Sequence, residues 1–329
     1  MFNHFSQKFR IHLNNLAQSY VKAFIIAICM GSTYGSLKAD EIDPNQSRRC
    51  AIRVSMSITG TSPTSELLGL EKPQDQVEQL LSSPLFIENF SRFLNSTFND
   101  LPGDTPAADA PYYLAKYVLE KREPFQKLFN GPYMVNAQPQ GTTPPVAVTE
   151  NPNGLGYFRS KAWMDRYAGN DIEGLRLVTA YRLANNILGM KVPATTNAPG
   201  ADVSAKGREA PACRGCHYDS WFALDRTASI LSKVSRDANG VITYIPTDEI
   251  PKLVLGDKML KNDKEFVDTM VNSEEFAFNS CRLSIKFLYG REVNSCDSQV
   301  FDKCIVAFKT SGIIQDAMAT IAKNSSFCQ

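Results

Sequence analysis

The chain has 329 residues, of which 43% are hydrophobic and 21% are charged. This is the composition of a globular protein with one large or two smaller domains, and it excludes wholesale disorder and a fibrous fold. Lys and Arg number 35 against 34 Asp and Glu. Because there is no basic excess to neutralise many phosphates, we expect no nucleic acid partner.

The first 39 residues have the features of a secretory signal peptide. They include no acidic residue, and an apolar run at 23–30 is followed by small and turn residues at 31–36. The run is shorter than the roughly 20 residues that span a bilayer. We therefore predict that 1–39 is removed on export to the periplasm, the cell surface or the medium, with no transmembrane segment left. An amphipathic N-terminal helix of a cytosolic protein is the alternative.

A haem-attachment motif lies in the second half of the chain. Residues 213–217 read Cys-Arg-Gly-Cys-His, the C-x-x-C-H pattern of c-type haem. Two intervening residues let both thiols reach the two vinyl groups on one edge of the macrocycle, and the histidine then becomes an axial iron ligand. We predict one covalent haem c per chain, bound by Cys213 and Cys216, with His217 as the metal ligand.

The sequence lacks the further residues that a zinc site or a thioredoxin-like redox motif would need. A zinc site needs four ligands, and the sequence has no second C-x-x-C and no histidine pair. A thioredoxin-like redox motif needs a βαβ context, which the sequence pattern does not show. A chance C-x-x-C and a simple disulfide are the remaining alternatives. Haem c attachment requires export, which the signal peptide supplies independently. After its removal His217 is the only histidine, since His4 and His12 lie within it.

The sixth iron ligand is open to prediction. A second histidine is excluded in the mature chain, so methionine is the expected partner, and we rank Met164 first, then Met190 and Met259. Met164 lies in an aromatic and basic stretch, 158–167, where aromatic rings could line the haem and basic groups could bind its propionates. Trp221 is expected to pack on the porphyrin edge. For each of these residues an ordinary core position is the alternative.

The pattern along the chain predicts a mostly α fold with a cytochrome c-like C-terminal region. We divide the mature chain into a helical N-terminal region at 40–136, a Pro/Gly-rich linker at 137–154 and a haem c-binding helical domain at 155–329. A turn at 237–240 is expected to close a small hairpin. Caps and apolar periodicity predict helices over 64–82, 84–98, 111–129, 171–188, 220–234, 263–289 and 296–323.

The remaining cysteines predict a disulfide-stapled helix hairpin. Five lie outside the signal peptide and the haem motif: Cys50, Cys281, Cys296, Cys304 and Cys328. Cys296 and Cys304 would be about 12 Å apart on one helix, beyond disulfide reach. Antiparallel helices favour Cys281–Cys304 and Cys296–Cys328, which leaves Cys50 as a free thiol. Other pairings stay open.

Three stretches resemble the planctomycete-type cytochrome families, which are exported and largely uncharacterised proteins with a C-terminal haem motif. Residues 53–64, followed by 77–84, are similar to their N-terminal segment, and 212–225 to their haem block. The closing region is matched by 288–291, Asp297, 311–312 and 325–327. The resemblance implies an exported helical haem protein in redox work. The chain lacks the histidine commonly found between the middle and haem segments of these families.

Together these features favour an exported monohaem cytochrome whose partner is another redox protein. No catalytic residue is assigned, since one histidine committed to iron excludes histidine-based catalysis elsewhere, and no P-loop or G-x-G-x-x-G motif occurs. Two alternatives stay open. One is a haem oxidoreductase, peroxidase-like or an oxidase subunit, with an open distal site, which would lack a distal histidine. The other is an adhesion or scaffold module with a structural haem.

Overall fold

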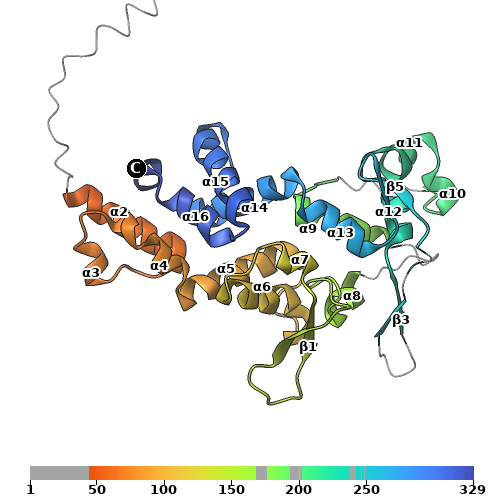
Figure 1. Ribbon diagram of the computed structural model, residues 1–329, viewed down its shortest axis with the longest axis horizontal. Helices are drawn as coiled ribbons and strands as arrows, with labels where there is room; N and C mark the ends of the chain where they lie inside the picture. The colour runs from red at the N-terminus through yellow and green to blue at the C-terminus, as the bar shows by residue number, and fades with distance from the viewer. Residues whose placement is uncertain are drawn as a thin grey trace, which may run out of the picture. The chain divides into compact units, whose positions relative to one another are not determined.

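Helices account for most of the described chain, which confirms the predicted mostly α fold (Figure 1). The predicted signal peptide, 1–39, lies outside the described residues. Within them, the strands form three separate two-stranded sheets. The computed structural model describes residues 44–167, 176–192, 200, 202–236, 242–245, 247 and 249–329.

The first helices are shorter and more numerous than the sequence predicts. They are α2 (Pro44–Thr59), α3 (Ser65–Leu68), a 3-10 turn (Pro73–Gln76), α4 (Val77–Leu81) and α5 (Pro84–Phe98). The predicted helix 64–82 is therefore broken, and α2 was not predicted. The start of α5 is confirmed, because the Ser83 hydroxyl accepts a hydrogen bond from Phe86 N at 3.2 Å, as an N-cap does.

The middle of the chain adds short helices and a hairpin. These elements are α6 (Ala110–Glu120), α7 (Lys127–Asn130), β1 (Tyr133–Ala137), β2 (Val146–Glu150), α8 (Lys161–Tyr167) and α9 (Leu177–Leu188). The predicted helix 111–129 is interrupted between α6 and α7. Arg122 there has φ +48°, and Pro124 has no N–H to donate. The expected linker, 137–154, contains β2 and the turn that joins it to β1.

The haem motif lies among short elements. They are α10 (Ala205–Arg208), α11 (Pro211–Arg214), a π-helical turn (Gly215–Asp219), α12 (Leu224–Ile230), β3 (Lys233–Arg236), β4 (Ile242–Ile245), β5 (Lys252–Val254) and β6 (Lys258–Leu260). The antiparallel pairing of β3 with β4 confirms the predicted hairpin, although its turn at 237–240 lies outside the described residues. The predicted helix 220–234 is limited to α12.

Four helices complete the chain. They are α13 (Asp263–Val271), α14 (Glu274–Tyr289), α15 (Ser298–Ser311) and α16 (Ile314–Ala322), with 3-10 turns at Ser295–Asp297 and Ser325–Cys328. Each predicted long helix is divided in two. Ser273 caps α14 by accepting from Phe276 N at 3.3 Å. Gly312, with φ +70°, ends α15 in the left-handed conformation that glycine adopts without strain.

One hydrophobic cluster joins segments from both sides of the expected linker. It includes Phe90 of α5, Val146 of β2 and Phe276 of α14. The Phe276 ring lies 5.5 Å from Phe129 and 5.7 Å from Phe308. Because aromatic pairs at this distance add to the free energy of burial, these rings connect α7, α14 and α15 in one core.

The disulfides confirm one predicted pair and overturn the other. Cys281 of α14 is bonded to Cys304 of α15, with their Cα atoms 5.9 Å apart, which confirms the stapled helix hairpin. The predicted Cys296–Cys328 pair is wrong, because Cys328 is bonded to Cys50 and Cys296 is an exposed free cysteine. The predicted pairing assumed that Cys296 begins a helix and that a turn near Gly312 places it opposite Cys328 on the next one. Cys296 lies on the preceding 3-10 turn instead, and α2 brings Cys50 to the end of the chain.

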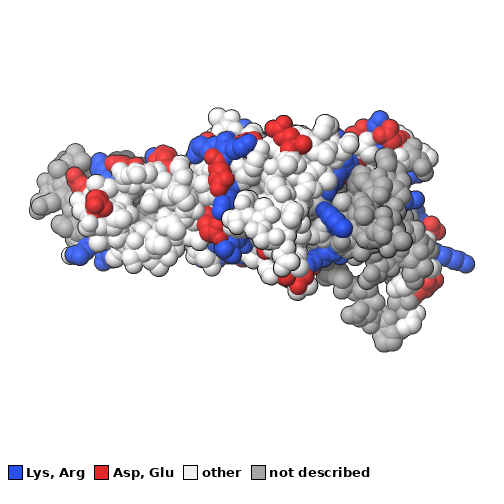
Figure 2. Space-filling model, turned by 90° about the horizontal axis from the view of Figure 1, so that it is seen from below, with Lys and Arg blue, Asp and Glu red and all other residues white. Residues whose placement is uncertain are grey.

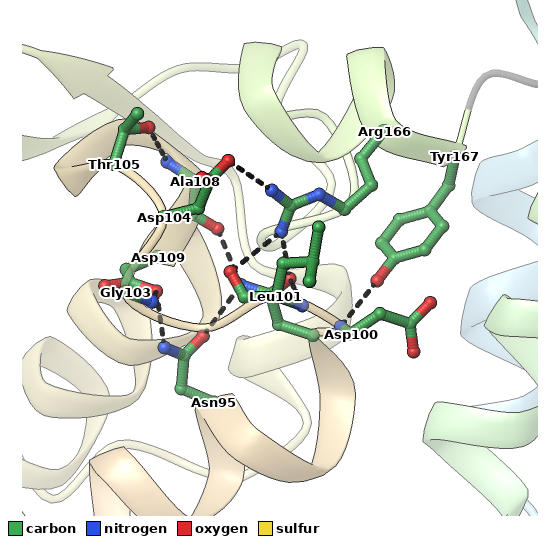
Figure 3. A network of polar contacts seen from close by, with 11 residues as sticks. Asn95, Asp100, Leu101, Gly103, Asp104, Thr105, Ala108, Asp109, Arg166 and Tyr167 are labelled. Atoms are coloured by element: carbon green, nitrogen blue, oxygen red, sulfur yellow. Dashed lines mark hydrogen bonds and ion pairs between the residues drawn. The ribbon is translucent and has the colours of Figure 1, made fainter.

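A polar network attaches α8 to the loop after α5 (Figure 3). The Arg166 guanidinium donates to Leu101 O at 3.1 Å and pairs with Asp104 at 3.0 Å. The Tyr167 hydroxyl accepts from Asp100 N at 2.9 Å. These contacts hold in place the helix that carries the candidate methionine ligand.

Basic and acidic side chains are interspersed on the face shown in Figure 2. Among the residues that the structure describes, no helix has the length and apolar character needed to cross a membrane.

Candidate haem attachment site

The C-x-x-C-H residues lie on one continuous helical stretch, formed by α11 and the π-helical turn after it. Pro211 begins α11, where its missing N–H is not needed. The turn closes with a hydrogen bond of 2.7 Å from Ser220 N to Gly215 O. Residues three and four apart share a helix face. Cys216 and His217 come three and four residues after Cys213, so each is a neighbour of the Cys213 side chain on this helical stretch.

This stretch is turned outward from the protein. None of the residues from Pro211 to Asp219 is buried. Cys213 is half-buried, Cys216 is exposed, and neither forms a disulfide. Neither cysteine is bridged, so each keeps a thiol of the kind that haem attachment uses.

A buried carboxylate binds the imidazole of His217. Nδ1 of His217 lies 2.6 Å from Oδ2 of Asp225, whose side chain is only 4% exposed. A carboxylate only accepts hydrogen bonds, so Nδ1 carries the proton and donates it. In the neutral imidazole, the other ring nitrogen, Nε2, then holds the lone pair that a metal ion requires. Asp225 lies in the first turn of α12, where the helix dipole favours a negative charge.

Two further side chains bind the same carboxylate. Arg208 of α10 donates from Nε to Oδ1 of Asp225 at 2.9 Å, and its own side chain is 13% exposed. The Tyr218 hydroxyl donates to the same oxygen at 3.3 Å. Burial raises the pKa of Tyr218 above 10.0, and the Asp225 charge and hydrogen bond raise it further. His217 therefore binds one carboxylate oxygen while Arg208 and Tyr218 bind the other.

Trp221 follows the motif and is partly open to solvent. Its side chain is 45% exposed, and its ring lies 5.5 Å from Phe222 in an edge-to-face arrangement. Its carbonyl accepts from Gly256 N at 2.9 Å, which joins it to the turn between β5 and β6. Leu253 and Met259 are cross-strand partners on this hairpin and are 42% and 60% exposed. Trp221, Leu253 and Met259 are therefore three exposed apolar residues near the motif in sequence or joined to it by the β5–β6 hairpin.

Met164 is buried in a part of the structure that does not include the haem motif. It is 7% exposed and lines a small cavity with residues such as Trp163, Leu231 and Ser232, but not His217. Leu231 comes directly after α12, whereas Asp225 is in the first turn of that helix, about 9 Å away along its axis. The structure does not bring Met164 to His217, so its role as sixth ligand stays a prediction.

The sequence pattern identified the motif but not the residues that support it. Asp225 belongs to the stretch that resembles the haem block of the cytochrome families, yet it had no assigned role there. No sequence pattern predicted a role for Arg208 or Tyr218. Their common partner, Asp225, comes within hydrogen-bond distance only when α10, the motif and α12 pack together.

The motif offers one imidazole as a metal ligand on the protein side. In the described part of the chain, no group of three or more His, Cys, Asp or Glu side chains could hold a metal ion. A haem iron already has four porphyrin nitrogens as ligands, so a single histidine is enough to hold it on the protein side. His217 has the free Nε2 that this role needs.

Comparison with known proteins gives no relative of this chain. No family model matches it, and neither a curated protein nor a solved structure gives a match. The chemistry of the motif and of its buried partners is therefore the basis on which a function can be inferred.

Proposed function

We propose that this chain is an exported c-type cytochrome that carries one covalently attached haem and transfers electrons to or from a partner redox protein. One observation carries this proposal. Two free thiols and one imidazole lie within five consecutive residues, and the imidazole is bound through Nδ1 so that Nε2 is available. This set of groups matches what covalent haem attachment needs.

Each residue of the site has a defined part. Cys213 and Cys216 would hold the haem through two thioether bonds, in each of which sulfur would bond one vinyl carbon and the thiol hydrogen would pass to the other, so that nothing is oxidised. His217 would supply Nε2 to the iron. Bound haem supplies a one-electron ferric–ferrous couple. Trp221, half-exposed beside the motif, would pack on the porphyrin edge.

We also propose that the chain is exported and that it belongs to the cytochrome families it resembles. The features of 1–39 favour delivery to the periplasm, cell surface or medium, where haem c is attached. The three matching stretches favour membership of the planctomycete-type cytochrome families. An exposed haem edge at the motif would serve electron exchange with a partner protein.

The first test is covalent haem attachment. The full chain is expressed with cytochrome c maturation machinery, and haem that survives a denaturing gel is measured together with the intact mass. We expect one haem per chain, and none after Cys213→Ser with Cys216→Ser. Cys296→Ser is the matched control, because it removes an exposed free thiol outside the motif and should retain the haem. A parent chain without covalent haem would overturn the proposal.

A haem oxidoreductase with an open distal position is the second candidate. It is favoured by the position of Met164, which lines a cavity that does not include His217. The absorption spectra of the oxidised protein and of Met164→Leu and Met259→Leu separate the two functions. Loss of the weak red band of a thioether ligand in one variant supports the electron carrier. A high-spin parent spectrum that changes with carbon monoxide or peroxide supports the enzyme.

A further inference from the structure

We infer that Asp225 is a positioning residue that acts through His217 to lower the reduction potential of the haem, and that Arg208 and Tyr218 limit this effect. The inference rests on the proposed haem attachment. It deepens that function by naming the residues that regulate its potential.

The first step is orientation. His217 follows Cys216 directly, so its backbone position is determined by the motif, but its ring could still rotate. The 2.6 Å contact between Nδ1 and Asp225 determines both the ring orientation and the tautomer. Asp225 is itself held in α12 and is 4% exposed, so its carboxylate is a rigid acceptor rather than a mobile surface group.

The second step is electrostatic. A carboxylate that accepts the Nδ1 proton makes the imidazole a stronger donor at Nε2. It also places a negative charge near the iron in a region where few water molecules screen it. Both effects favour the more positive, ferric iron over ferrous iron. The reduction potential is therefore lower with Asp225 than with a neutral acceptor at the same position.

The third step concerns the other carboxylate oxygen. Arg208 donates to Oδ1 at 2.9 Å and Tyr218 at 3.3 Å. Each donor withdraws negative charge from the carboxylate and so weakens its effect on His217. Removing the Asp225 charge should raise the reduction potential. Removing one of the two donors should lower it. Simple loosening of the site would not produce this reversal of sign.

The test is spectroelectrochemical titration of the haem-loaded chain. Asp225→Asn keeps the shape and an accepting oxygen but removes the charge. At a fixed solution potential, we expect the ratio of reduced to oxidised protein to rise at least tenfold, which is 59 mV for a one-electron couple. Arg208→Gln should lower this ratio several-fold. Tyr218→Phe should lower it by less and serves as the milder variant if Arg208→Gln does not fold.

Asp219→Asn is the matched control. It removes the same charge from a neighbouring carboxylate that is 50% exposed and pairs with Arg214, so it should leave the ratio near that of the parent. Equal ratios for Asp225→Asn and Asp219→Asn would overturn the inference. Shifts of Asp225→Asn and the donor variants in the same direction would also overturn it. Bound haem is measured first in every sample, so a parent without haem identifies failure of the proposed function itself.

Discussion

The Cys50–Cys328 disulfide joins the first described helix to the last turn of the chain, and its contribution to stability can be predicted from chain length. The two cysteines are 278 residues apart, whereas Cys281 and Cys304 are 23 apart. In the chain-entropy model, a disulfide destabilises the unfolded state by an amount that grows with the logarithm of loop length. The two loops give about 5.6 and about 3.4 kcal/mol at 25 °C.

The difference of about 2 kcal/mol is measured with two variants that each keep one bridge. One replaces Cys50 and Cys328 with Ala, and the other replaces Cys281 and Cys304 with Ala. Each variant is unfolded in urea with its remaining bridge intact and again after reduction, so that the buried packing lost by substitution cancels. Extrapolated free energies of unfolding are compared rather than midpoints, because a cross-link also changes the slope.

The other cysteines are replaced by Ser in both variants to prevent thiol exchange; they are Cys29, Cys213, Cys216 and Cys296. Reduction should destabilise the variant that keeps Cys50–Cys328 more than the one that keeps Cys281–Cys304. The reasoning would be refuted if reduction of Cys50–Cys328 lowered the free energy of unfolding by the same amount as reduction of Cys281–Cys304, or by less. Such a result would show that the unfolded chain already keeps its two ends close together.

Three further predictions concern the core, a helix cap and an ion pair. Phe276→Ala should destabilise the fold by about 3–5 kcal/mol, because the ring is 2% exposed within the aromatic core; a loss below about 1 kcal/mol in urea unfolding would contradict this. Ser83→Ala should cost about 1 kcal/mol by removing the cap on Phe86 N, and Ser83→Asn, which retains an acceptor, should restore most of it. The Arg291 guanidinium beside Asp297 holds the pKa of that carboxyl below its ordinary 3.8, so the ion pair stabilises the fold above that pH and loses its contribution as the pH falls through the lowered pKa. The stability difference between Asp297→Asn and the parent should therefore narrow between about pH 5 and about pH 2, and a constant difference would exclude this linkage.

Several elements could be predicted because their cause is local. The start of α5 depends on Ser83 followed by Pro84, and the β3–β4 hairpin was predicted from the turn residues at 237–240 and the β-branched and aromatic residues that follow them. The pairing of Cys281 with Cys304 required only that two neighbouring helices be antiparallel. The long predicted helices were divided because single residues such as Ser273 and Gly312 form caps within patterns that are otherwise continuous.

The candidate site divides in the same way. Cys213, Cys216 and His217 are recognised from five consecutive residues, because the chemistry needs that spacing and nothing else. The sequence by itself therefore determined the motif and the helical class. Only the tertiary structure decided that Asp225 binds His217, that Arg208 shares that carboxylate and that Cys328 meets Cys50. The physical reason is that these contacts depend on how separate helices pack together, and a buried carboxylate or thiol acquires its partner only when that packing excludes water around it.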